Sequence, residues 1–225
     1  MVAINNIHND NKISIDFSFI PSLECDIECP FCMYDAGPDK TEILDINTTR
    51  SFLKSIDWGM INSCGLYGGE PSINLPLYKE FYDLIPVNTP KFMITNGSWS
   101  TDTQACLDFL KFMDDNPCHL VVSGTPYHKI FQNKMVLKEM KKGCPDGIRL
   151  KGDDIIHPMG RASKKNWTCN YKCQRFNVPI RLGLFPNGDI LFQNCDGVYP
   201  VVKTYHETFD INNVYKAIRK CNETN

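Results

Sequence analysis

The sequence predicts an α/β fold in which a parallel sheet is built from successive strand–helix units. Short apolar runs with β-branched residues alternate about six times with segments whose apolar residues recur at helical spacing. The 225 residues are 42% hydrophobic and 22% charged, an ordinary balance for a chain that buries a core. Because strand–helix–strand units join parallel strands through right-handed crossovers, we expect one parallel sheet flanked by helices.

The elements follow from local patterns along the chain. Residues 13–20 alternate apolar and polar side chains, which predicts a strand. Asp45 or Thr48 then caps a helix that continues to about residue 57. The next strand ends at a Gly-Gly pair. The later elements that we expect are a helix over residues 76–85, a strand over 91–95, a helix from Thr101 or Asp102 to 113, a strand over 119–123, a helix over 129–142 and short strands over 147–151 and 155–157.

Helical spacing also indicates which side chains face the core. The inward positions that we expect are Ile46, Phe52, Leu53 and Ile56 in the first helix, Leu107, Leu110 and Phe112 in the helix ending at 113, and Ile130, Met135, Val136 and Met140 in the helix over 129–142.

Charge is unevenly distributed, although the formal net charge is only −2. Residues 1–120 hold 7 Lys and Arg against 17 Asp and Glu, whereas residues 121–225 hold 17 against 9. The basic half suits an anionic partner, but solvated helix faces would scatter the same charges without a function. Nucleic acid is not favoured as that partner, because the basic residues are not interleaved with an aromatic platform.

Location follows from the apolar runs and the cysteines. No apolar run approaches the length of about 18 residues that a membrane span needs. The cysteine count is odd, at 11, and residues 1–20 lack the pattern of a signal peptide. We therefore expect a cytoplasmic protein with reduced thiols and no membrane partner.

Three cysteines, Cys25, Cys29 and Cys32, follow the first predicted strand within eight residues. Thiolates are the soft ligands that iron–sulfur clusters and zinc select, and four ligands normally complete such a site. A cubane cluster held by these three alone would keep one iron without a protein ligand. In the alternative of structural zinc, the candidates for the fourth ligand are Cys64, His119 and His128.

A second informative segment lies about one strand–helix unit later. There a short apolar run breaks into Gly68 and Gly69, followed by Glu70 and Pro71. Paired glycines at a strand end let the backbone approach another group closely, although alone they predict only a turn.

Together the two segments resemble the signature of the radical S-adenosylmethionine (SAM) enzymes, with Phe31 as the aromatic residue before the last cysteine and a GGEP motif one unit later. The resemblance implies a partial (β/α)6 TIM-like barrel over residues 1–158, open on one side. It implies a [4Fe–4S] cluster on Cys25, Cys29 and Cys32 whose open iron binds the amino and carboxylate groups of SAM. In the family, an electron from the cluster cleaves SAM to a 5′-deoxyadenosyl radical, which abstracts hydrogen from the substrate. A flavodoxin or ferredoxin would donate the electron.

The same resemblance implies the SAM-binding residues. The backbone of Gly68 and Gly69 and the carboxylate of Glu70 receive the SAM amino group beside Pro71, and Phe31 packs near the adenine. Further SAM-binding candidates at the ends of predicted strands are Thr95, Asn96, Ser123 and Arg149. For the last two, an exposed turn and an ordinary surface arginine are the alternatives. No catalytic acid or base is assigned.

Residues 159–225 resemble the twitch extension, the half-length form of the SPASM domain that binds an auxiliary iron–sulfur cluster. We expect a hairpin of residues 180–184 and 190–193 around an Asn-Gly turn, and a helix over about 210–220. The candidate ligands of the auxiliary cluster are Cys169, Cys173, Cys195 and Cys221. Because the segment between Gly188 and Cys195 is longer than in the family pattern, zinc and free thiols stay open as alternatives. The cysteines expected to be small buried hydrophobic side chains are Cys64, Cys106, Cys118 and Cys144.

The resulting functional prediction is a radical SAM enzyme that modifies a peptide or protein side chain. A nucleotide or another phosphorylated small molecule is the alternative substrate, since the C-terminal half is basic. An alternative of another class is a non-catalytic zinc or iron–sulfur binding interaction module.

Overall fold

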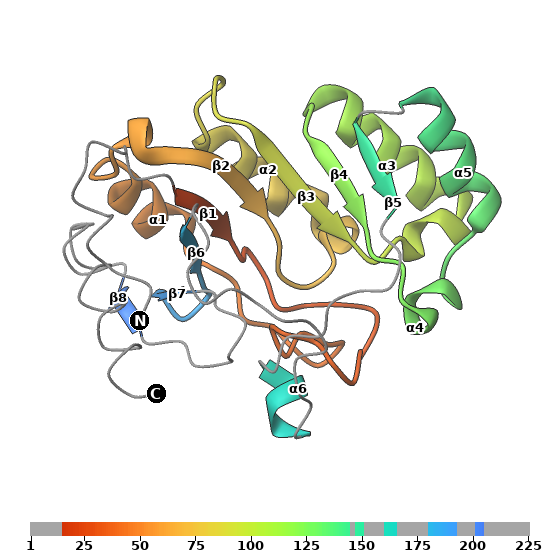
Figure 1. Cartoon of the computed structure of the whole chain (residues 1–225), viewed down its shortest axis with the longest axis horizontal. Coiled ribbons are helices and arrows are strands. Elements are labelled where there is room, and N and C mark those ends of the chain that lie inside the picture. Colours follow the sequence, from red (N-terminus) through yellow and green to blue (C-terminus); the bar gives the residue numbers. More distant parts are fainter. Residues whose placement is uncertain (1–14, 145–146, 151–159, 166–179, 193–200, 205–225) are drawn as a thin grey trace, which may run out of the picture.

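The computed structural model describes residues 15–144, 147–150, 160–165, 180–192 and 201–204, and the strands in these ranges form one sheet. The strands are β1 (Ile15–Phe19), β2 (Ile61–Leu66), β3 (Lys91–Thr95), β4 (His119–Val122), β5 (Ile148–Leu150), β6 (Ile180–Leu184), β7 (Asp189–Phe192) and β8 (Val201–Thr204). Their spatial order is β5-β4-β3-β2-β1-β6-β7-β8 (Figure 1). All neighbours from β5 to β6 are parallel, and the pairs β6–β7 and β7–β8 are antiparallel.

Helices connect the parallel strands. They are α1 (Ile46–Leu53), α2 (Leu75–Leu84), α3 (Thr103–Asp115), α4 (Pro126–Lys129), α5 (Lys134–Gly143) and α6 (Gly160–Lys164), with 3-10 turns η2 (Trp58–Met60), η3 (Pro71–Asn74) and η4 (Ser98–Thr101). Asp45 caps α1 by accepting from the Thr48 N–H, and Asp102 caps α3 by accepting from the Ala105 N–H. The sequence left Asp45 or Thr48 and Thr101 or Asp102 open as caps, and the structure confirms Asp45 and Asp102. None of the described helices combines the length and the apolarity needed to cross a membrane.

The α/β fold with a mainly parallel sheet is therefore confirmed, with one unexpected connection. Strand β6 belongs to the hairpin that the sequence assigned to the C-terminal extension, yet it pairs in parallel with β1 from Ile15–Ile180 to Phe19–Leu184. The hairpin β6–β7 forms around the turn that contains Gly188. The extension's first strand thus continues the main sheet, whereas predicted strand 155–157 and predicted helix 210–220 lie outside the described residues. The division into 1–158 and 159–225 stays a prediction.

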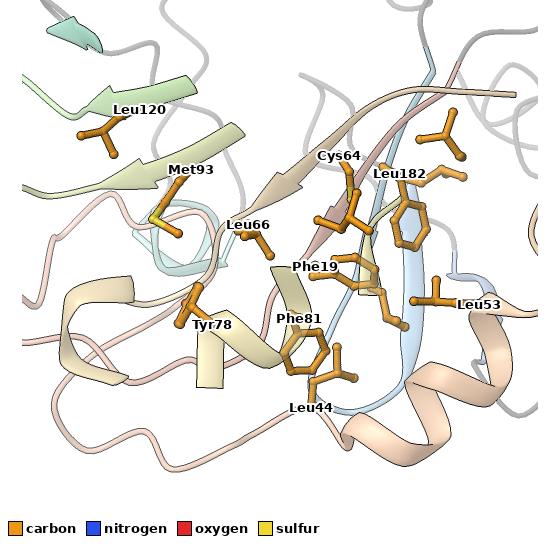
Figure 2. Packing of buried hydrophobic residues seen from close by; sticks show 14 of the residues in the cluster. Phe19, Leu44, Leu53, Cys64, Leu66, Tyr78, Phe81, Met93, Leu120 and Leu182 are labelled. Carbon is orange, nitrogen blue, oxygen red and sulfur yellow. The ribbon is translucent and has the colours of Figure 1, made fainter. Parts of the chain in front are cut away.

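The main core lies between the sheet and helices α1, α2, α3 and α5. Figure 2 shows Phe19 of β1 facing Phe81 of α2, with Leu44 and Leu53 from the α1 region beside them. The Phe19 and Phe81 ring centroids are 5.6 Å apart. Burial of such large apolar side chains contributes about 1.5–3 kcal/mol each. This packing fixes β1 and β2 side by side and so determines where the loops after them lie.

Several predicted inward positions are wrong. The helix expected over 129–142 is split, because the Asn133 side chain caps a new helix by accepting from the N–H groups of Met135 and Val136. The split turns Ile130 and Met135 outward, at 72% and 79% exposure, and Leu137 takes the buried position of α5. In α3 the buried residues are Phe109 and Phe112, whereas Leu107 is exposed. Cys144 is also exposed, contrary to its prediction as a buried hydrophobic residue.

Candidate functional site

The loops after β1 and β2 lie side by side at the carboxyl edge of the sheet. We call residues 20–37 the cysteine loop and residues 67–71 the glycine loop. In Figure 1 the arrowhead of β1 leads into the cysteine loop, with α6 beside it. The strand pairing continues into the loops, because the Gly69 N–H donates to Ser22 O at 2.8 Å and the Glu70 N–H to Glu24 O at 2.8 Å. Both segments that the sequence singled out are thereby in contact.

Glycine at position 69 is required by this contact. A Cβ atom built on Gly69 would lie 1.7 Å from the Glu24 carbonyl oxygen, far inside van der Waals distance. Gly68 has a φ of 128°, a conformation that residues with a Cβ rarely adopt. The paired glycines therefore let the glycine loop approach the cysteine loop backbone to backbone, as their position at a strand end predicted.

Glu70 links the ends of β2 and β3. Its carboxylate is 2% exposed and accepts hydrogen bonds from Thr95 Oγ1 at 2.6 Å and from the Asn96 N–H at 2.7 Å. Ser72 adds its N–H at 3.1 Å and its hydroxyl at 2.8 Å. Burial raises the pKa of Glu70 to about 7, although these hydrogen bonds act to lower it. A carboxylate has about four acceptor positions, so the protein itself engages Glu70 as a structural link.

Cys25 and Cys29 form one small buried cluster with Ile27 and Ala36, and the half-buried Cys32 packs against it. Each sulfur lies near a different nitrogen. The Ala36 N–H donates to Cys32 Sγ at 3.4 Å, Asn96 Nδ2 lies 3.7 Å from Cys25 Sγ, and His128 Nε2 lies 3.2 Å from Cys29 Sγ. The predicted ligands thus share one environment, and Asn96 reaches it from the end of β3.

The thiols are poorly suited to stand alone as anions. Burial raises the pKa of Cys25 and of Cys29 to about 12. For Cys29 the neighbouring sulfurs of Cys32 and Cys25 raise the pKa further, whereas Arg161 lowers it. Thiolates in such a site need a cation, because closely spaced buried negative charges repel one another.

Arg161 is a member of the site that sequence reasoning missed. Its side chain is 10% exposed, and it donates to Cys29 O and Ala36 O, both at 2.7 Å. The guanidinium also pairs with Asp35 at 3.2 Å. Its backbone N–H donates to Cys32 O at 2.9 Å. Arg161 lies more than a hundred positions after the cysteines, so no local spacing links it to them. Gly160 precedes it, and a Cβ added to Gly160 would lie 2.5 Å from Met33 O.

The other predicted residues are distributed as follows. Phe31 is half-buried, and its ring contacts those of Tyr127 and His128 at centroid distances of 6.0 and 5.9 Å. Ser123 bonds to Thr95 O through its backbone N–H, and Arg149 is exposed on the edge strand β5. The SAM-binding roles of all these residues stay predictions. The proposed auxiliary ligands Cys169, Cys173, Cys195 and Cys221 lie outside the described residues.

A cavity of about 510 Å³ opens beside the cysteine loop. Asp26, next to Cys25, forms part of its wall, together with Ser72 from η3 and Ser98 from η4. Asn96 Nδ2 holds the Asp26 carboxylate at 2.7 Å. Ile73 and Phe131 add apolar surface. The cavity therefore combines a few polar groups with apolar walls, as binding sites for small molecules do.

The donor set fits an iron–sulfur cluster with one open position. Among the described residues, no three His, Cys, Asp or Glu side chains are arranged to hold a single metal ion. A cubane makes a different demand, because it spreads its thiolate ligands over separate iron atoms. Cys25 and Cys29 in one buried cluster, with Cys32 packed against it, supply three soft donors, which matches that demand with one iron left over.

Comparison with solved structures gives a fold-level match. BtrN in complex with AdoMet and 2-DOIA has a TM-score of 0.60 at 16% identity, and the match covers 95% of this chain and 87% of that chain. Streptococcus suis SuiB bound to S-adenosylmethionine matches with a TM-score of 0.43 and 12% identity over 93% of this chain and 67% of its own. For anSMEcpe with bound AdoMet the TM-score is 0.42 at 17% identity. The match covers 60% of this chain and only 43% of that protein.

No protein-family model and no curated protein sequence matches the chain. The likeness to BtrN shows a shared α/β fold and supports the predicted partial-barrel architecture.

Proposed function

We propose that this protein is a radical SAM enzyme in which Cys25, Cys29 and Cys32 hold a [4Fe–4S] cluster. The observation that carries the proposal is the contact between the cysteine loop and the glycine loop at the carboxyl edge of a parallel sheet. Active sites of parallel α/β folds lie at that edge. When bound, the cluster supplies the electron that cleaves SAM reductively, the chemistry that the sequence resemblance implies.

The chain's own residues have separate roles in this proposal. Glu70 and Asn96 fix the ends of β2 and β3, so that the backbone of the glycine loop faces SAM at a constant position. Phe31 lies at the same site with its ring held by Tyr127 and His128. The cavity beside Asp26 gives room for a ligand next to Cys25. Burial of Cys25 and Cys29 limits the access of water to the cluster.

We further propose a peptide or protein side chain as the substrate and an auxiliary cluster on Cys169, Cys173, Cys195 and Cys221. Both follow from the resemblance of residues 159–225 to a twitch extension. A flavodoxin or ferredoxin is the proposed electron donor, and the cytoplasm the proposed location. The nucleotide alternative has less support in α5, where Lys142 pairs with Glu139 and the lysines form a solvated helix face. The reading frames beside the gene distinguish the two candidate substrates. A frame for a short precursor peptide favours the peptide substrate, and genes of nucleotide metabolism favour the nucleotide.

The test is anaerobic reconstitution with iron and sulfide, followed by iron counting and an assay for 5′-deoxyadenosine. We expect a brown protein that cleaves SAM, and loss of cleavage when Cys25, Cys29 and Cys32 are replaced by Ala. The matched control replaces Cys106, Cys118 and Cys144, which lie outside the cysteine loop, and should cleave SAM normally. Iron that remains in the loop variant supports the auxiliary cluster. A colourless wild-type protein that binds zinc and ignores SAM would make the protein an interaction module instead.

A further inference from the structure

His128 is a buried histidine in contact with one of the three cysteines. It lies in α4, is 8% exposed, and its Nε2 is 3.2 Å from Cys29 Sγ. Its Nδ1 is 2.9 Å from Thr125 Oγ1. The three residues therefore form a chain of contacts, Thr125 to His128 to Cys29, that joins the end of β4 to the cysteine loop.

The hydrogen bonds around Thr125 allow the imidazole tautomer that carries its proton on Nε2. Thr125 Oγ1 accepts from the backbone N–H of His128 at 3.3 Å, as the cap of α4. Its hydroxyl hydrogen can donate to Nδ1, and in that arrangement the proton of the neutral ring lies on Nε2. When Cys29 is a metal-bound thiolate it has no hydrogen to donate, so Nε2–H is the donor and the sulfur is the acceptor.

Geometry makes Cys29 different from its neighbours. Cys32 receives a backbone N–H at 3.4 Å and Cys25 faces a side-chain amide at 3.7 Å, whereas the imidazole approaches Cys29 to 3.2 Å. The ring is held in place, because Phe31 packs edge-on against it at 5.9 Å. Tyr127 fixes the same helix by donating from its hydroxyl to Glu28 O at 3.3 Å.

We propose that His128 is a positioning residue that donates a hydrogen bond from Nε2 to the Cys29 thiolate, and that this bond raises the reduction potential of the cluster. The inference rests on the proposed [4Fe–4S] site. Hydrogen bonds to ligand sulfur are one of the means by which proteins set cluster potentials, because they stabilise the reduced state with its greater negative charge. His128 acts as a donor beside the site, because its Nε2 faces the Cys29 sulfur at 3.2 Å and its Nδ1 is engaged by the Thr125 hydroxyl at 2.9 Å.

The experiment compares the midpoint potential of the reconstituted wild-type protein with that of three variants. His128→Phe keeps the ring size and removes the donor, so we expect a potential more negative by about 59 mV, equivalent to a tenfold change in the one-electron equilibrium. Thr125→Val keeps the imidazole and removes the hydroxyl that orients it, and should shift the potential in the same direction by less. His119→Phe is the matched control, because His119 is exposed on β4 and stacks on Phe92, away from the cysteine loop.

The outcomes separate this inference from the proposed function. Full iron content with an unchanged potential in His128→Phe overturns the inference and leaves the proposed function standing. Loss of iron from a folded His128→Phe protein also overturns it, because His128 would then be a ligand. If that variant does not fold, Thr125→Val decides the matter by its own potential. A wild-type chain that binds no iron removes both proposals.

Discussion

Two buried charged side chains lie beside the cysteine loop, the carboxylate of Glu70 and the guanidinium of Arg161. Glu70 accepts four hydrogen bonds from hydroxyl and backbone donors, and none of these donors in the described chain is a cation. Arg161 donates to two carbonyl oxygens of the loop and pairs with a carboxylate. Glu70 fixes the ends of β2 and β3, and Arg161 fixes the backbone between the cysteines. Loss of Glu70 and loss of Arg161 should therefore have different consequences.

The largest effect should come from disrupting the contact between the two loops. Gly69→Ala places a Cβ against the Glu24 carbonyl, so the loops must separate, and we expect a loss of more than about 4 kcal/mol of stability or failure to fold. Gly143→Ala in α5 is the control, because nothing lies within 4 Å of its added Cβ. That variant should be as stable as the wild type or gain about 0.5–1 kcal/mol. Urea unfolding measures both, and equal stability of the two variants would contradict the close contact.

Removing the Arg161 guanidinium should reduce the stability somewhat less than Gly69→Ala does. Arg161→Met leaves the carbonyls of Cys29 and Ala36 without this donor and Asp35 without this partner, at an expected cost of about 3 kcal/mol. The distinguishing result is a loss of bound iron at temperatures where the sheet is still folded, measured by iron content beside circular dichroism. Arg50→Met serves as control, since Arg50 is exposed and contacts Asn47 of its own helix. Full iron retention in Arg161→Met would show that Glu70 alone fixes the loop.

The smallest effect concerns the protonation of Glu70. Folding raises its pKa from 4.5 to about 7, so the folded state binds a proton more tightly than the unfolded state. The stability of the wild type relative to Glu70→Gln should therefore be greatest below pH 4.5, fall as the pH rises towards about 7, and then level off. Below pH 4.5 the glutamine variant should be less stable than the wild type by about 1–3 kcal/mol, because its amide nitrogen cannot accept hydrogen bonds. Glu139→Gln, an exposed change in α5, should show no such pH dependence. A constant difference across this pH range would mean that folding leaves the pKa of Glu70 unchanged.

The sequence alone determined the elements and one side of the site. Alternating strands and helices, Asp45 and Asp102 as candidate caps, and the positions of the cysteine and glycine segments at strand ends were all readable, because each depends on residues close together in the chain. Only the tertiary structure decided the contacts between residues that are far apart in the sequence. The pairing of β6 with β1, the clamp by Arg161 and the approach of His128 to Cys29 join residues about a hundred or more positions apart. No local spacing encodes such contacts, since packing of the whole sheet brings these segments together.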